Sequence, residues 1–150
     1  MENSLRAQVR YVNFGQPSDA HSYLTAARRL CSGVHALAKG ASATGFACSI
    51  LAALALECAL KAHLSSIGFT VNRLTHDPLD SDLENLWIEA ASRGLDIPPR
   101  PPQWCSQLNE EHGVEMPLQH AAGLQGLEPA VLLSIARELA ELVETVAKAI

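Results

Sequence analysis

The chain has 150 residues, a mass of 16.1 kDa and a formal net charge of −5 at pH 7. This is the length of one ordinary domain, and 48% hydrophobic residues suffice for a buried core, which excludes a wholly disordered chain. Only 5% of the residues are aromatic, so the core must consist of small aliphatic side chains, which favours packed helices over a sheet. The negative charge disfavours non-specific binding along a nucleic-acid backbone but leaves room for a local basic patch.

The first half of the chain predicts an arm and two long helices. Residues 1–17 are expected to form an irregular arm before a single helical domain over residues 18–150. Ser18 is a good N-cap for a first helix, whose apolar stripe continues at three- and four-residue steps until Gly40. A second helix is expected from Ser42 or Thr44 to about Ile67. Its predicted core face comprises Phe46, Ile50, Leu54, Leu60, Leu64 and Ile67.

The second predicted helix is apolar on most sides, which is typical of a central helix touched by several neighbours. Its uncharged stretch, residues 41–56, is shorter than the roughly 20 residues of a membrane span, so we expect a buried core helix and no membrane association. No secretory signal is recognised at the N-terminus, which predicts a reducing cytoplasmic location. The four cysteines form no CxxC pair and have no zinc-ligand spacing, so neither a metal nor a cofactor is expected.

The second half of the chain predicts three more helices. A connection over residues 69–78 precedes a helix that starts between Asp80 and Asp82, with Glu84 completing a capping arrangement, and ends at Gly94. A further helix is expected over about residues 102–112, followed by a loop over residues 113–126. The last helix begins at Glu128-Pro129 and keeps one apolar face to the end of the chain.

Residues 97–102 read Ile-Pro-Pro-Arg-Pro-Pro, a run that can only be extended because proline fixes φ and lacks an amide donor. The run could be a ligand for a proline-reading module or a stiff connector between helices. We favour the connector, because Trp104 follows directly and is expected to anchor it to the core.

Glu57 is the most informative charge, because it lies in the middle of the most apolar predicted helix, where an unpaired carboxylate would be costly. Lys61 follows four residues later, in the favourable order for a helical ion pair. Two interpretations are open. The pair could form a polar site at the centre of the bundle, or a surface ion pair worth a few tenths of a kcal/mol.

A second candidate group is Thr75-His76-Asp77. A histidine beside an aspartate can act as a general base with an orienting carboxylate, and Arg73 could supply a positive charge for a phosphate. Alternatively, these residues form a loop that caps the next helix. His63, alone on an apolar helix, is expected to be a packing residue with satisfied polar atoms.

The order of motifs resembles that of small HEPN-like helical proteins. Residues 54–64 resemble the family's "ALExxLKAxL" helix. The later segments Thr75-His76-Asp77, residues 83–87 and residues 90–95 are similar to its "HdL…LW…A…GL" run. The resemblance covers about residues 20–150 and implies an all-α, up-and-down bundle of about five helices that commonly forms a homodimer.

Active ribonucleases of this family carry an arginine, a polar residue and, after a short spacer, a histidine, and cleave RNA without a metal. Neither Arg29-Leu30 nor Arg137 matches this motif, and the chain has no HExxH, P-loop, GxGxxG or GxSxG motif. The resemblance therefore implies a non-catalytic module that binds a nucleotide, RNA or a protein, in a defence or toxin–antitoxin setting.

The expected binding residues are Glu57, Lys61, Arg73, His76 and Asp77. One alternative is a metal-independent ribonuclease with His76 as its acid or base and Arg73 or Arg29 as its phosphate anchor. Another is a purely structural interaction protein that presents the last helix, or exposed parts of the second helix, to its partner.

Overall fold

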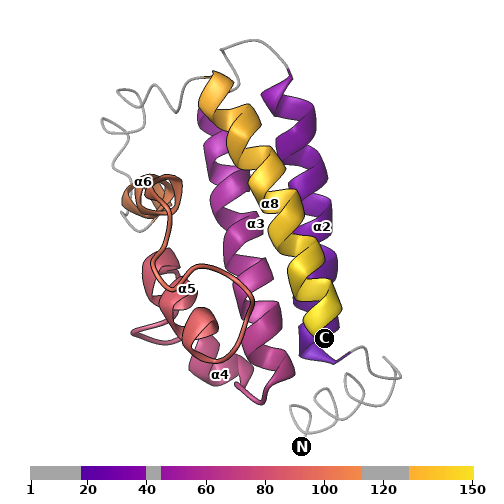
Figure 1. Ribbon diagram of the computed structural model, residues 1–150, viewed down its shortest axis with the longest axis vertical. Helices are drawn as coiled ribbons and strands as arrows, with labels where there is room; N and C mark the ends of the chain where they lie inside the picture. Colours follow the sequence, from indigo (N-terminus) through magenta and orange to yellow (C-terminus); the bar gives the residue numbers. More distant parts are fainter. Residues whose placement is uncertain (1–17, 40–44, 113–128) are drawn as a thin grey trace, which may run out of the picture.

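The computed structural model describes residues 18–39, 45–112 and 129–150, and every regular element within these ranges is a helix (Figure 1). The predicted all-α bundle is thus confirmed. The predicted arm over residues 1–17 and the predicted loop over residues 113–126 lie outside the described residues. The helices are α2 (Asp19–Ala38), α3 (Gly45–Ser66), α4 (Val71–Leu74), α5 (Leu83–Ser92), α6 (Gln103–His112) and α8 (Pro129–Ala149).

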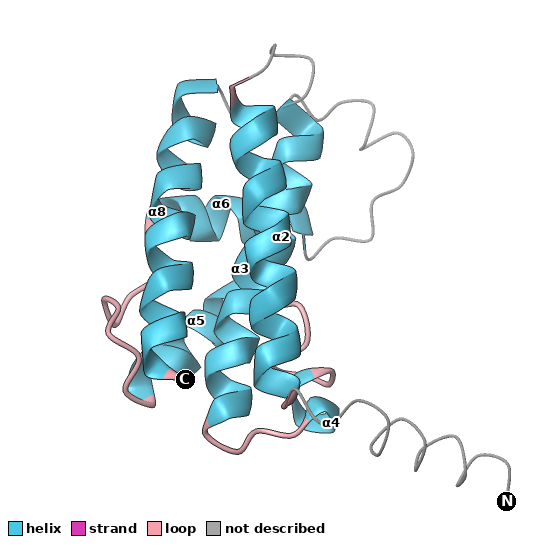
Figure 2. Ribbon diagram, turned by 90° about the vertical axis from the view of Figure 1, so that its right-hand side faces the viewer, coloured by secondary structure: helices cyan, strands magenta, loops and turns pink. Residues whose placement is uncertain are grey.

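The three long helices α2, α3 and α8 lie side by side, and α2 runs in the direction opposite to the other two (Figure 1). The shorter helices α5 and α6 pack against α3 and against each other, while α4 lies at one end of the bundle (Figure 2). Helix α3 therefore contacts α2, α5, α6 and α8, which confirms its predicted central place. By length and composition alone, α3 could also span a membrane, but in this structure 61% of its most apolar window is buried.

The predicted core face of α3 was only partly right. Leu60 and Leu64 are fully buried, whereas Ile50 is 36% exposed and Ile67 is 46% exposed. Alanine and cysteine occupy six of the thirteen buried positions of α3, and such small side chains let neighbouring helices approach closely. In a helix packed on several sides, the stripe of large side chains does not define the buried surface.

Local capping explains where the helices begin and end. The Ser18 hydroxyl accepts a hydrogen bond from the His21 amide at the start of α2, as predicted. Helix α5 is capped by Asp82, one of the predicted starts, whose carboxylate accepts from the amide of Asn85; Glu84 lies in the first turn, but the side-chain cap comes from Asp82. Gly68 and Gly94 have φ values of +109° and +100°, a conformation that glycine adopts without strain at helix ends.

Helix α4 is a single turn that forms within the segment predicted as a connection. The Thr70 hydroxyl accepts from the Arg73 amide and caps the turn. Leu74 is fully buried and anchors the turn to the bundle. A four-residue helix with one buried residue leaves too short an apolar pattern to be recognised in the sequence.

The proline-rich run is a connector that the two tryptophans hold against the bundle. The indole Nε1 of Trp87 donates to the Pro98 carbonyl at 2.7 Å. Trp104, buried as expected, packs edge-on against Trp87, with ring centroids 6.1 Å apart and an interplanar angle of 87°. These contacts support the connector interpretation, and they fix a rigid aromatic corner between α5 and α6.

His63 is buried in α3, but neither ring nitrogen has a hydrogen-bond partner among the residues that the structure describes, so the expectation of satisfied polar atoms is wrong. Burial lowers the pKa of His63, and the backbone of Arg93 opposes this shift with a smaller effect. The folded protein therefore holds His63 neutral over a pH range in which the unfolded chain protonates it.

This depressed pKa predicts a pH-dependent stability. Above the unfolded pKa of about 6.5 the histidine is neutral in both states and adds no slope. As the pH falls below that value, the unfolded state binds the proton first, so the free energy of unfolding should decrease. Urea unfolding across this range should show the decrease, and His63→Leu should flatten it. The exposed His21→Gln is the control. If the free energy of unfolding of His63→Leu decreased with falling pH as much as that of the wild type, the pH dependence would come from other groups.

Candidate functional site

The predicted Glu57–Lys61 contact is present. Lys61 Nζ donates to Glu57 Oε2 at 3.0 Å, and the side chains of Lys61 and Glu57 are only 4% and 18% exposed. The pair is therefore not the surface ion pair of the alternative interpretation. Removing two charges from water is costly, and their mutual attraction offsets that cost only when the geometry is good.

Tyr23 of α2 extends this polar group, and sequence reasoning missed it because its spacing places it in the apolar stripe. Burial raises the pKa of Tyr23, and the negative charges available at Cys58, Asp19 and Glu57 raise it further. The phenol therefore stays protonated and able to donate a hydrogen bond. The Glu57–Lys61 pair of α3 thus lies within electrostatic reach of Tyr23 on α2.

The second predicted group lies apart from this cluster, on the surface at the end of α4. His76 and Asp77 are exposed. The Nδ1 of His76 bonds to the Asn72 carbonyl at 2.6 Å, and Thr75 Oγ1 lies 3.5 Å from the same nitrogen. Within the described residues these are the partners of the His76 ring, so Asp77 does not orient it. The contacts of Thr75 and His76 reach back to α4 and end that helix, whereas Asp82 caps α5, so the predicted alternative of a loop that caps the next helix is wrong.

Arg73 does not stand alone, because Arg93 shares its aromatic neighbour. The guanidinium Cζ atoms of Arg73 and Arg93 lie 4.0 Å and 5.3 Å from the centroid of the Phe69 ring, which is itself buried. Glu89 accepts from Arg93 Nε at 3.1 Å and fixes its orientation. We call Phe69, Arg73 and Arg93 the arginine cluster. The sequence separation of 20 residues between its two arginines hides it from motif reasoning.

The five predicted site residues thus divide into two groups. The structure brings Glu57 and Lys61 together within the bundle, and it places Arg73, His76 and Asp77 at the α4 end. The predicted phosphate anchor of the alternative, Arg29, is exposed on α2.

The four cysteine thiols are free. Burial, with smaller contributions from Glu84 and Asp82, raises the pKa of Cys105 to about 12, so this thiol is neutral and a poor nucleophile. In the part of the chain that the structure describes, no group of three or more histidine, cysteine, aspartate or glutamate side chains is placed to hold a metal ion.

A pocket of about 210 Å³ lies on another face, between the aromatic corner, the connector after α5 and helix α8. Trp87 and Trp104 line it together with the carboxylates of Asp96, Glu138 and Glu141. Sequence reasoning did not predict this site. A usable signal was present in the last helix, where Glu138, Glu141, Leu142 and Thr145 follow the i, i+3, i+4, i+7 spacing of one face.

In comparisons with known proteins, no protein-family model, no curated protein and no solved structure matches this chain.

Proposed function

We propose that this protein is a non-catalytic binding module whose ligand carries phosphate, with single-stranded RNA as the ligand class. The observation that supports this proposal most directly is the arginine cluster, with His76 close by in sequence just beyond α4. Guanidinium groups bind phosphate through paired N–H donors, and their flat faces can also stack on unpaired bases.

The geometry of the cluster suits such a ligand. Both guanidinium Cζ atoms lie within 5.3 Å of one ring centroid, so two cationic groups are held on one small area, and the Nη atoms of Arg93 stay available for a phosphate while its Nε donates to Glu89. The side chains that carry them are exposed, while Phe69 beneath them is buried and acts as a rigid support. An aromatic support lowers the rotational freedom of each arginine before binding, and that reduces the entropy lost when the ligand is bound.

The state of His76 favours binding over catalysis. Acid–base cleavage of RNA needs one group to remove a proton and another to deliver one. Among the described residues, His76 has no carboxylate partner, and its Nδ1 is engaged by a backbone carbonyl. Because Nδ1 donates to that carbonyl, Nε2 is the nitrogen left to face a ligand, and in the protonated ring it can donate a hydrogen bond to a phosphate oxygen, which is a binding role.

The HEPN-like relationship, the homodimer, the cytoplasmic location and the defence context stay predictions. The bundle supports the relationship only at the level of an all-helical fold. Light scattering would distinguish a homodimer from the 16.1 kDa monomer.

RNA binding by the arginine cluster can be measured by fluorescence anisotropy with a labelled single-stranded RNA. We expect Arg73→Gln/Arg93→Gln to weaken binding about tenfold at low salt and to lower the salt slope by about 0.7 for each phosphate that the variant no longer neutralises. Arg137→Gln is the matched control, because Arg137 is exposed on α8. Equal losses in the double variant and in the control would contradict a local site.

The same experiment tests the ribonuclease alternative. Arg73 and His76 are only three residues apart in the sequence, so this alternative needs a direct test. Each RNA sample is incubated with EDTA and run on a denaturing gel. Intact RNA with the wild type supports the binding module. Cleavage by the wild type that His76→Ala abolishes would replace it with a metal-independent ribonuclease.

A further inference from the structure

We propose that the pocket between the aromatic corner and α8 binds an organic cation, namely an ammonium or guanidinium head with a short aliphatic stem. This site is distinct from the arginine cluster in its residues and in the charge of its ligand. Its walls come from Trp87 of α5, the connector at Asp96 to Pro102, Trp104 of α6 and one face of α8.

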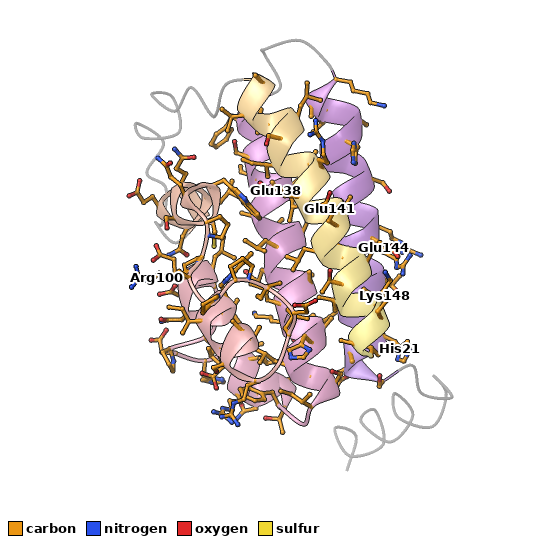
Figure 3. All side chains as sticks on the ribbon, viewed as in Figure 1. His21, Arg100, Glu138, Glu141, Glu144 and Lys148 are labelled. Atoms are coloured by element: carbon orange, nitrogen blue, oxygen red, sulfur yellow. The ribbon has the colours of Figure 1, made fainter. Side chains whose placement is uncertain are left out.

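The charge of the side chains around the pocket decides whether its ligand is a cation or an anion. Its rim carries the carboxylates of Asp96, Glu138 and Glu141, and none of the described side chains that line it is basic. These three carboxylates are exposed, and within the described ranges no arginine, lysine or histidine forms an ion pair with them. Figure 3 labels Glu138 and Glu141 along α8, with Arg100 well apart from both at the left of the view.

The apolar wall decides what else the ligand must carry. Tryptophan rings attract cations through their quadrupole, and quaternary ammonium groups are recognised by sites built from aromatic rings. Trp87 is already held by its hydrogen bond to Pro98, so its ring position is set before any ligand arrives. Trp104 is nine-tenths buried beside the pocket and packs edge-on against Trp87, so the second aromatic wall is also held in place.

The volume limits the size of the ligand. At about 210 Å³ the pocket is smaller than the roughly 300–1,000 Å³ typical of sites for drug-sized molecules. It accommodates one cationic head group and its stem and excludes a nucleotide, which the negative rim would also repel. The cation can therefore be a free amine or a lysine or arginine side chain of a partner.

Tryptophan fluorescence reports on this pocket directly, because both tryptophans of the chain line it. We expect choline and butylammonium to give a saturable change at concentrations of about 10 mM or less. The neutral choline isostere 3,3-dimethyl-1-butanol should bind at least about tenfold more weakly. Added salt should weaken the binding of the cations, because the carboxylates are exposed.

Matched variants separate the pocket from general surface charge. Glu138→Gln/Glu141→Gln should weaken choline binding about tenfold, since each carboxylate adds attraction to the bound cation. Glu144→Gln, on the same helix but paired with Arg28 at 3.6 Å, removes a charge without touching the pocket and should bind like the wild type. Circular dichroism checks that each variant keeps its helices.

The ligand panel also distinguishes the two sources of the cation. Tighter binding of blocked lysine or arginine amides than of butylammonium and choline would assign the pocket to a partner's side chain. The reverse order would assign it to a small amine. The proposal fails if no cation gives a saturable change, if the neutral isostere binds equally well, or if the double variant binds like the wild type. None of these results bears on RNA binding by Arg73 and Arg93.

Discussion

Replacing Glu57 by alanine is expected to lower the free energy of unfolding by about 3 kcal/mol, the size found when one partner of a buried ion pair is removed. The reason is the state of Lys61, whose side chain is only 4% exposed and donates to Glu57 Oε2 at 3.0 Å. Without that carboxylate, the ammonium group must stay buried and uncompensated or force the helices apart. Urea denaturation of the two proteins measures the difference.

The structure offers a matched control for this prediction in Glu89 and Arg93. They form the same kind of i, i+4 pair at 3.1 Å, but their side chains are 28% and 49% exposed. Glu89→Ala should therefore cost only about 0.5 kcal/mol. In the Glu57→Ala background, Lys61→Met should restore part of the lost stability, because it removes the buried charge. Equal losses in the free energy of unfolding for Glu57→Ala and Glu89→Ala would show that burial of the Glu57–Lys61 pair does not affect its contribution to stability.

The second large effect is expected in the centre of α3. Leu60 is fully buried in the helix that contacts four others, so Leu60→Ala should destabilise the protein by about 4 kcal/mol. The loss combines the burial of the missing methyl groups with a cavity that tightly packed neighbours cannot fill. Thermal or urea unfolding monitored by circular dichroism gives the value.

Ile50→Ala is the matched control for the core substitution, because Ile50 lies on the same helix but is 36% exposed. Its cost should be about 1 kcal/mol, in proportion to the smaller apolar area that it buries. A cost as large as that of Leu60→Ala would mean that another surface covers Ile50 in solution. A second copy of the chain, as in the predicted homodimer, is one such surface.

Much of the local structure followed from the sequence. Ser18 as an N-cap and Gly68 and Gly94 as helix stops depend only on the conformations that single residues favour. The apolar face predicted for the last helix is mostly buried in α8, because spacing suffices where a helix is covered on one face, and the buried residues of α5 (Leu83, Leu86, Trp87 and Ala90) have the same helical spacing. The Glu57–Lys61 contact also followed, since four residues along a helix bring two side chains together whatever surrounds them.

The features that depend on the surroundings of a helix were decided by the tertiary structure. Helical spacing alone could not tell whether Glu57 and Lys61 face water. It also placed Ile50 and Ile67 in the core, because a spacing argument assigns a single buried face even to a helix that is covered on several sides. The arginine cluster joins residues 69, 73 and 93, and the acidic pocket joins α5, α6 and α8, so both exist only once the helices are packed. The sequence by itself determined the helices and their ends, because these depend on contacts within a few residues. The packed bundle alone decided burial, and with it both candidate sites, because burial depends on what segments distant in the chain bring into contact.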